Sequence, residues 1–238
     1  MQVGSLKDKK ISNKGIYVAL LVIITWGIFI GFAFNYTTSF LNPWNILITL
    51  ILTHLYTGLF ITAHDAMHGT VSASEKVNNS IGKLCVILYA CFSYDKIKEK
   101  HHSHHKHVAT DEDPDYHNSN FFVWFWMFMK NYMVLRQLLL MAILYNILNL
   151  GFGIPKVNLI LFWIVPPILS SLQLFYFGTY LPHKNPKEIH NKYKSRTQNI
   201  NIFWGFVSCY FFGYHYEHHA KPGTPWWKLW REKTPQKS

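Results

Sequence analysis

The sequence predicts a single all-α domain over residues 1–238 that is integral to a membrane and carries a histidine-rich cap on one face. Two observations lead to this prediction. Long apolar runs with almost no charge alternate with short segments rich in Lys, Arg and His, which is typical of spanning helices and their loops. Three histidine motifs, at 64–68, 101–107 and 215–219, place their imidazoles at helical spacing.

The composition fits this division. Half of the residues are apolar, aromatic residues reach 17%, and charged residues make up only 15%. Mean hydropathy is just +0.04, because basic loops offset the apolar runs. The formal charge of +11 raises the alternative of a nucleic-acid-binding protein. The basic residues form no separate domain, however, so a basic membrane face that meets anionic lipid explains the charge better.

The N-terminal third predicts two spans. Residues 1–15 form a basic tail, and the apolar run 16–34 is long enough for a spanning helix of ~20 residues. The run lacks a small-residue cleavage site, so we expect a retained span and no signal peptide. After the uncharged linker 35–43, a second span over 44–63 runs directly into His64. The positive-inside rule places the tail and His64 on the cytoplasmic side.

The middle of the chain has shorter apolar segments. Residues 69–80 are polar and turn-like, and 81–94 is apolar for only ~14 residues, which favours a re-entrant or interfacial helix. Residues 95–120 are predicted to form a polar loop that contains the central histidine motif. Residues 121–136 are rich in Phe, Trp and Met but include two basic residues, as is typical of a helix at the membrane interface.

Two further spans complete the predicted fold. The third covers 138–152, and a tight turn at 151–156 leads to the fourth over 157–181, where Pro166-Pro167 is expected to kink the helix. The apolar segment 200–214 is again interfacial. With about four crossings, the chain returns to its starting side, so all three histidine motifs are predicted on the cytoplasmic face.

The histidine motifs predict a site for two metal ions. Residues at i, i+3 and i+4 share one helix face, so each motif points several imidazoles in one direction. About eight nitrogens exceed the roughly four ligands of one zinc site. Uncoordinated histidines this close together would repel when protonated and would be costly to bury unpaired. The candidate ligands are His64, His68, His101, His104, His105, His215, His218 and His219.

The identity of the metal is not fixed by imidazole ligands, which suit Zn, Cu, Fe and Ni. The motifs contain no cysteine, which argues against a soft-metal site. A membrane location favours a lipid-dissolved substrate, for which oxidation of an unactivated or allylic carbon is a common task. Iron with O2 suits such work, whereas zinc chiefly catalyses hydrolysis.

The sequence resembles the bacterial beta-carotene ketolases, within the membrane di-iron desaturase and hydroxylase superfamily. The three motifs match the superfamily pattern HxxxH, HxxHH and HxxHH. The strings HDAMHG at 64–69, DPDYH at 113–117 and FGTYLPH at 177–183 are similar to those of the ketolases in particular. The resemblance covers about residues 44–230. One departure is Tyr216, where the ketolase pattern has His, outside the HxxHH ligand positions.

The resemblance implies that the eight histidines bind two iron ions, with His183 as a further ligand or a group just outside the ligand set. It implies O2-dependent oxidation at C4 of a beta-ionone ring, by two hydroxylations and loss of water. Beta-carotene would pass through echinenone to canthaxanthin, and zeaxanthin towards astaxanthin. Electrons must come from an external carrier such as a ferredoxin, because the chain has no flavin, haem or nicotinamide fingerprint. The carotenoid would lie in the bilayer of a bacterial plasma (inner) membrane.

Four acidic residues could accept the second N–H of a ligating imidazole and so fix its orientation. They are Asp65, Asp113, Asp115 and Glu217. Asp65 and Asp115 are the preferred candidates for such a catalytic role. The alternative is that Asp113-Pro114-Asp115 is a turn and Asp65 a helix-end residue.

The remaining histidines have less specific signals. His102, His107 and His117 are outer partners of the metal site or solvated residues, and His190 is expected at the surface. His54 lies in the middle of a span, where an ionisable group is a functional candidate, so it is the candidate contact to substrate.

Two other readings of the function stay open. A carotene hydroxylase or a fatty-acid desaturase would use the same histidine motifs and yield an alcohol or a new double bond instead of a ketone. A metal transporter or sensor, with the motifs as an ion relay, belongs to a different class. It is disfavoured because the motifs gather at one membrane face and the spans carry few polar groups to form a path.

Overall fold

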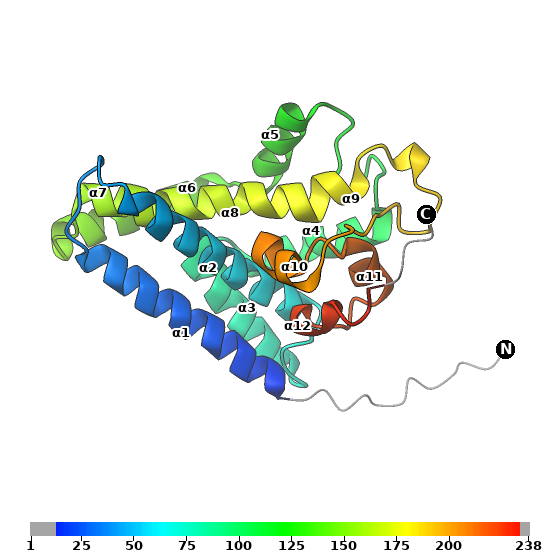
Figure 1. The fold of residues 1–238 in the computed structure, drawn as a ribbon, viewed down its shortest axis with the longest axis horizontal. Helices are drawn as coiled ribbons and strands as arrows, with labels where there is room; N and C mark the ends of the chain where they lie inside the picture. The colour runs from blue at the N-terminus through cyan, green and yellow to red at the C-terminus, as the bar shows by residue number, and fades with distance from the viewer. Residues whose placement is uncertain (1–12, 234–238) are drawn as a thin grey trace.

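The computed structural model describes residues 13–233, which form a helical bundle without strands in that range (Figure 1). The all-α prediction is therefore confirmed for this part of the chain. Three helices are long and apolar enough to cross a membrane: α1 (Lys14–Asn35), α2 (Trp44–Met67) and the helical run Lys156–His183. α1 and α2 cover the runs 16–34 and 44–63, and α2 continues past the expected end, so His64 lies inside the helix.

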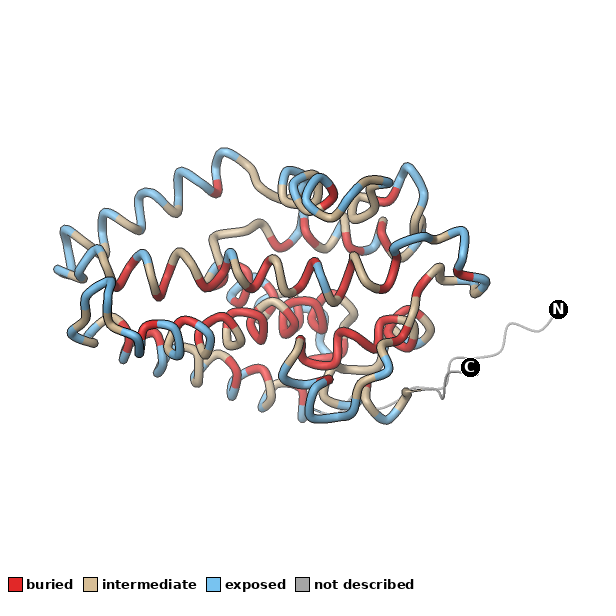
Figure 2. Tube along the Cα trace, turned by 45° about the horizontal axis from the view of Figure 1, so that its top comes forward, coloured by how far each residue is buried: buried red, intermediate tan, exposed pale blue. Residues whose placement is uncertain are grey.

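The outer faces of these helices are apolar. Leu21, Ile28 and Ile46 are each about two-thirds exposed, and exposed residues follow the outer sides of the bundle (Figure 2). A lipid-embedded helix needs such a surface, because all its backbone groups are bonded internally and its side chains meet acyl chains. The core lies along α2, where Leu52 and Tyr56 are fully buried.

The two linkers between spans lie at the same end of the bundle. The Nδ2 group of Asn158 donates to the carbonyls of Ala33 and Tyr36, 2.7 Å from each. Gly153 has φ +69, a left-handed conformation that favours glycine and that forms the tight turn expected at 151–156. The histidine-bearing helices lie at the opposite end (Figure 1). All three histidine motifs are thus at one end of the bundle, whereas the side of the membrane that this end faces stays a prediction.

The middle of the chain is more helical than predicted. α3 (Glu75–Ala90) begins inside the supposed turn 69–80 and packs along α2. α4 (Tyr94–His107) replaces the first half of the loop predicted for 95–120. The loop prediction was wrong because this segment has no apolar stripe. Its buried residues are Tyr94, Ile97, His101 and His104, and a hydropathy pattern does not register imidazoles as core residues.

The third predicted span, 138–152, is not an isolated spanning helix. α5 (Phe121–Tyr132) meets α6 (Leu135–Asn146) and its π-helical extension Ile147–Gly151 at an 82° bend. Only the bent pair together is long and apolar enough to count as a fourth candidate span. The expected number of four spans therefore holds only if this pair is one broken span.

The last span is continuous. It comprises α7 (Lys156–Asn158), α8 (Val165–Phe175) and α9 (Leu181–His183), joined by π-helical turns. Pro166 and Pro167 lie in the first turn of α8, directly after a π-helical segment, and the helical run continues through them. The kink expected at these two residues stays a prediction.

The C-terminal segment folds back against the end of α2. α10 (Ile202–Cys209) ends where Tyr210 and Phe211 adopt positive φ angles of 48° and 64°. This turn reverses the chain and brings α11 (His215–Ala220) beside the histidines of α2 and α4. The short α12 (Trp226–Leu229) follows.

Candidate metal centre

Four helices place nine histidines together at one end of the bundle. His64 and His68 come from the end of α2, His183 from the end of α9, and the rest from α4 and α11. The imidazoles form two groups, and within each group the candidate ligand nitrogens lie within 4.8 Å of one another. Group A consists of His64, His68, His101, His105 and His218. Group B consists of His104, His183, His215 and His219.

Within group A the Nε2 atoms face one another. The Nε2 atom of His68 lies 2.7 Å from that of His101, and the Nε2 atom of His105 lies 2.9 Å from that of His218. Neutral imidazoles offer one N–H and one lone pair each, so five converging Nε2 atoms cannot all be satisfied by bonding each other. A cation at their centre would accept all of these lone pairs, and the donor set therefore fits a metal ion.

In group B the Nε2 atoms also face one another, and residues outside the group accept hydrogen bonds from its imidazoles. The Nε2 atom of His219 lies 3.2 Å from that of His104 and 3.1 Å from that of His215. The Nδ1–H of His183 donates to the Lys194 carbonyl at 2.8 Å, and its buried Nε2 has no hydrogen-bond partner within residues 13–233. Donation from Nδ1 fixes the tautomer and leaves the Nε2 lone pair directed into the group, as a metal ligand requires.

Asp113 supports group B through His104. The Nδ1–H of His104 donates to both carboxylate oxygens, at 2.9 and 3.0 Å. Backbone N–H groups of Ala109 and Asp115 also donate to this carboxylate, at 2.8 and 2.9 Å. Burial alone would raise the pKa of Asp113, but the hydrogen bond and charge of His104 and these two N–H groups lower it. An ionised, fully bonded carboxylate therefore holds the His104 ring in place.

Burial keeps most of these imidazoles neutral. Desolvation, reinforced by neighbouring histidines, lowers the pKa of His68 to about 3 and that of His105 to about 2. His104 differs: burial opposes its protonation, yet the bond to Asp113 and the charges of Asp113 and Asp115 raise its pKa. Neutral imidazoles have their lone pairs free for a metal at physiological pH.

The two preferred carboxylates lie near the groups but make weaker contacts than Asp113. Oδ1 of Asp65 is 3.8 Å from Nδ1 of His64, and Oδ2 accepts the backbone N–H of Trp226 at 3.0 Å. Oδ2 of Asp115 is 3.9 Å from Nδ1 of His104, and Oδ1 accepts the Tyr132 hydroxyl. Their catalytic roles stay predictions. Sequence spacing gave no signal that Asp113, and not Asp115, bonds to His104 directly.

The other candidates lie outside the two groups. The fourth acidic residue, Glu217, is buried and accepts the Thr197 hydroxyl. His102 donates to the Met67 carbonyl at 3.3 Å, and Nε2 of His107 lies 3.1 Å from a Glu112 carboxylate oxygen.

Two more histidines make only local contacts, and a third is at the surface. His117 bonds to the Ser119 hydroxyl at 2.9 Å, and His190 is exposed. His54 stacks on the Tyr210 ring at a centroid distance of 4.4 Å, on the α10 side of α2.

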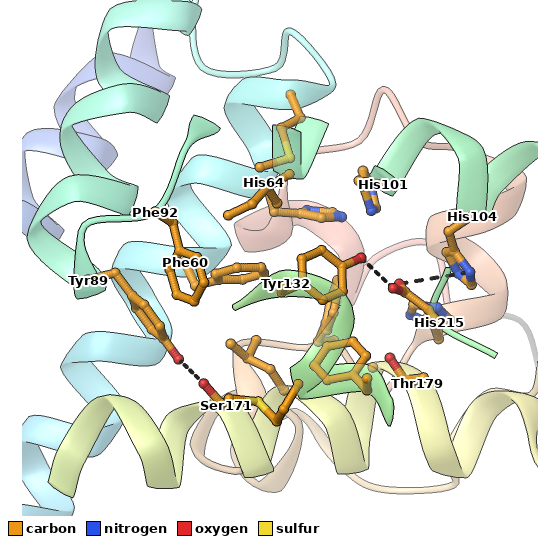
Figure 3. A pocket seen from close by; sticks show the side chains of 18 residues that line it. Phe60, His64, Tyr89, Phe92, His101, His104, Tyr132, Ser171, Thr179 and His215 are labelled. Atoms are coloured by element: carbon orange, nitrogen blue, oxygen red, sulfur yellow. Dashed lines mark hydrogen bonds and ion pairs between the residues drawn. The ribbon is translucent and has the colours of Figure 1, made fainter. Parts of the chain in front are cut away.

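An apolar cavity adjoins both groups. The space between atoms, counted together with the open side of the cavity, is about 730 Å³, and His64, His101, His104 and His215 form the part of its wall nearest the groups (Figure 3). Asp115, Tyr132 and Thr179 add polar groups at this end. Most of the remaining lining is apolar and comes from scattered positions to which sequence reasoning gave no role: Phe60, Met67, Tyr89, Phe92, Ile97, Phe128, Met129, Leu174 and Phe212.

Comparisons with known proteins agree with this site. A family model described as fatty acid desaturase matches residues 41–149 and 121–233. A beta-carotene ketolase of Paracoccus sp. (strain PC1) is 36% identical over 94% of this chain and 93% of its own length. A zeaxanthin 4-ketolase of Chlamydomonas reinhardtii is 40% identical over 90% of this chain. A beta-carotene ketolase of Haematococcus lacustris is 40% identical over 76% of it.

The two algal relatives are longer proteins. The chain spans only 52% and 59% of their lengths, respectively, in contrast to almost all of the Paracoccus relative. No solved structure gives a significant match.

Proposed function

The chain belongs to the fatty acid desaturase family, and within it to the beta-carotene ketolases, and from this premise we propose that it is a carotenoid 4-ketolase. The substrate is a carotenoid dissolved in the bilayer, and the reaction converts the C4 methylene of a beta-ionone ring to a ketone. Beta-carotene would give echinenone and then canthaxanthin, and a zeaxanthin ring would be oxidised at the same position.

One observation carries this proposal: two groups of converging histidines adjoin the end of an apolar cavity. A beta-carotene ring offers only hydrocarbon surface for recognition, so apolar walls are needed to hold it. The C4 methylene has no group that a base or nucleophile could attack directly. Oxidation by a metal centre beside the ring is therefore the chemistry that this pairing favours.

We infer that groups A and B each hold one iron ion. Bound iron would supply the activation of O2 that C–H oxidation needs. Imidazole ligands alone would also bind other metals, so we assign iron because the proposed reaction needs O2 to be activated. Two observations fit this assignment. The Nε2 atom of His183 is fully buried and has no partner in residues 13–233, and the Nε2 atoms within each group face one another.

The overall reaction balances with an external reductant. Each hydroxylation uses one O2, two electrons and two protons and releases one water. A second hydroxylation at the same carbon gives a geminal diol, which loses water. One ring thus consumes two O2, four electrons and four protons to leave a carbonyl and three waters. The electrons come from a carrier such as a ferredoxin in this proposal.

The residues around the groups have supporting tasks. Asp113 and the Lys194 carbonyl hold His104 and His183 with their Nε2 atoms turned inward. Asp65 lies beside His64 and is itself held by the Trp226 backbone. Asp115 lines the cavity next to His104, and we assign it, with its Tyr132 partner, to delivery of the protons that the released water takes up.

We place the histidine end in the cytoplasm of a bacterial plasma membrane. The loop after α9, at the histidine end, carries several basic residues, whereas the two linkers at the other end, 35–43 and 151–156, contain a single Lys. This asymmetry follows the positive-inside rule.

Pigment analysis in a beta-carotene-producing bacterium tests the proposal. Cells that express the chain should accumulate keto-carotenoids, identified by chromatography and mass spectrometry, whereas a His104→Ala variant should not. A His190→Ala variant, altered at an exposed histidine, is the matched control and should behave like the unaltered chain. Hydroxylated carotenoids without ketone, or a new double bond, would move the chain to the hydroxylase or desaturase alternatives. Unchanged beta-carotene with folded, iron-loaded and reduced protein would contradict the carotenoid assignment.

A further inference from the structure

A second cavity leads away from the histidines. The space between its atoms, counted together with its open side, is about 1000 Å³, and it is lined chiefly by α6 and α8. Tyr89, Phe92, Met129 and Ser171 line both cavities, so the two spaces meet at these four residues. In Figure 3, Tyr89 and Ser171 lie at the end of the first cavity that is distant from His104. The second cavity therefore extends the first one on the side away from the metal groups.

One helix face runs along both spaces. The run Lys156–His183 contributes Trp163, Pro167, Ser171, Leu174 and Gly178, which recur at helical spacing. From the first to the last of these the helix rises roughly 20 Å, at ~1.5 Å per residue or slightly less in π-helical turns. The combined space is thus long and narrow, a shape that suits a rod-like ligand.

The polar atoms at the junction between the cavities are hydrogen-bonded to one another. The Tyr89 hydroxyl and the Ser171 hydroxyl lie 3.0 Å apart, and each is 2.9 Å from the Pro167 carbonyl. Because these groups satisfy each other, the passage between the cavities presents little polar surface to a ligand. Beside this pair, the rings of Tyr89 and Phe92 pack against each other, with centroids 6.0 Å apart, and Ser171 contributes only a small side chain.

The second cavity, called the outer cavity from here on, opens toward lipid. Two of its lining residues, Leu138 on α6 and Ile168 on α8, are 51% and 53% exposed. Other exposed apolar residues of α6, such as Leu139 and Ile143, continue the same surface. Its methionines, Met133 and Met141 among them, are flexible and polarizable and can pack against a ligand of irregular outline.

We propose that the two cavities form one substrate channel, which takes a carotenoid lengthwise from the lipid between α6 and α8. The near ring lies at the histidine groups, the polyene passes the Tyr89–Ser171 junction, and the far end stays in the outer cavity or the lipid beyond it. This inference rests on the proposed function. Since the channel contacts one ring and the adjoining chain, it also accepts shortened polyenes with a single beta-ionone ring.

Obstruction of the outer cavity tests the channel with two substrates. The variant Ala142→Trp/Ile168→Trp adds bulk at two lining positions of the outer cavity. The matched control Leu139→Trp/Ile143→Trp places two Trp side chains at exposed positions of α6 outside the lining. Purified, iron-loaded proteins with a chemical reductant or carrier are given beta-carotene or retinal, which carries one such ring on a chain about half as long. Retinal should end before the obstruction.

The expected pattern is selective. The unaltered chain and the control should oxidise both substrates. The obstructed variant should lose beta-carotene oxidation by about tenfold or more and keep retinal oxidation within about twofold, because only the longer substrate needs the space that the Trp side chains fill. Equal loss or equal retention on both substrates would overturn the channel, as would an unaltered chain that oxidises beta-carotene but not retinal. An unaltered chain that oxidises neither substrate would instead count against the proposed function itself.

Discussion

The two histidine groups use the same side chain but differ in their surroundings. All members of group B are buried, and His104 and His183 are each anchored by a hydrogen bond from Nδ1 to a fixed acceptor. In group A, His68 and His105 are partly exposed, and the nearest carboxylate, Asp65, is 3.8 Å from Nδ1 of His64. The difference indicates that group B is the more rigid and group A the more accessible of the two sites.

The largest expected effect comes from removal of a group B ligand. His104→Ala deletes an Nε2 donor and leaves the buried Asp113 carboxylate without its main partner. We expect ketone formation to fall by roughly a hundredfold or more and about one iron per chain to be lost, because an incomplete ligand set neither holds nor activates the metal. Metal analysis and pigment analysis check this. Retained activity and iron would break the assignment of group B.

The next largest effect should come from the anchors. Asp113→Asn keeps the shape but removes the charge, so iron affinity or activity should drop about 10- to 100-fold, as is typical when an outer partner of a ligand is altered. Asp65→Asn is the matched change beside group A and should cost less, since its carboxylate is farther from its imidazole. Chelator competition measures both. A larger loss for Asp65→Asn would reverse the comparison between the groups.

Metal removal should reveal a smaller difference between the groups, in the rate at which each loses its iron. When an iron-loaded sample is treated with a strong chelator, we expect one iron to leave several-fold faster than the other, because His68 and His105 of group A are partly exposed. Iron content over time shows whether there are two phases. The fast phase should disappear in His105→Ala and persist in His183→Ala. Two ions that leave at one rate in the unaltered chain would show that the difference in exposure has no kinetic consequence.

The smallest effect concerns the stability of the metal-free protein. Burial lowers the pKa of His68 to about 3 and of His105 to about 2, below the ordinary value of about 6.5. The unfolded chain therefore binds more protons below about pH 6.5, and the free energy of unfolding decreases as the pH is lowered, by up to about 1.4 kcal/mol per histidine at pH 5.5. Thermal melts at pH 7.5 and 5.5 measure this. His68→Gln should reduce the slope, and an unchanged slope would contradict it.

The spans and the ligand candidates could be predicted from the sequence because each depends on local pattern. The apolar runs of α1 and α2 and the run Lys156–His183 are long enough to be recognised by length alone. All nine candidate histidines lie in the two groups. Helical spacing explains why each motif points inward, since it fixes which side chains share a face.

The division into two groups could not be predicted, because it depends on how helices face each other. On α4, His101 and His105 belong to group A, whereas His104, between them, belongs to group B. The 82° bend between α5 and α6 and the bond from His104 to Asp113 likewise arise from tertiary contacts. The cavity lining is drawn from helices far apart in the chain and has no spacing of its own.

The shared use of α4 and α11 has a consequence for the distance between the two metal positions. Each helix contributes side chains to both groups, and on α4 these are only one residue apart. A rigid α4 therefore fixes the separation of the two metal positions: if the helix shifts as a unit, both positions move together. A residue inserted between His104 and His105 would rotate the His105 side chain by about 100° about the helix axis relative to His104. The span that ends at His183, by contrast, supplies group B alone and can alter that position independently.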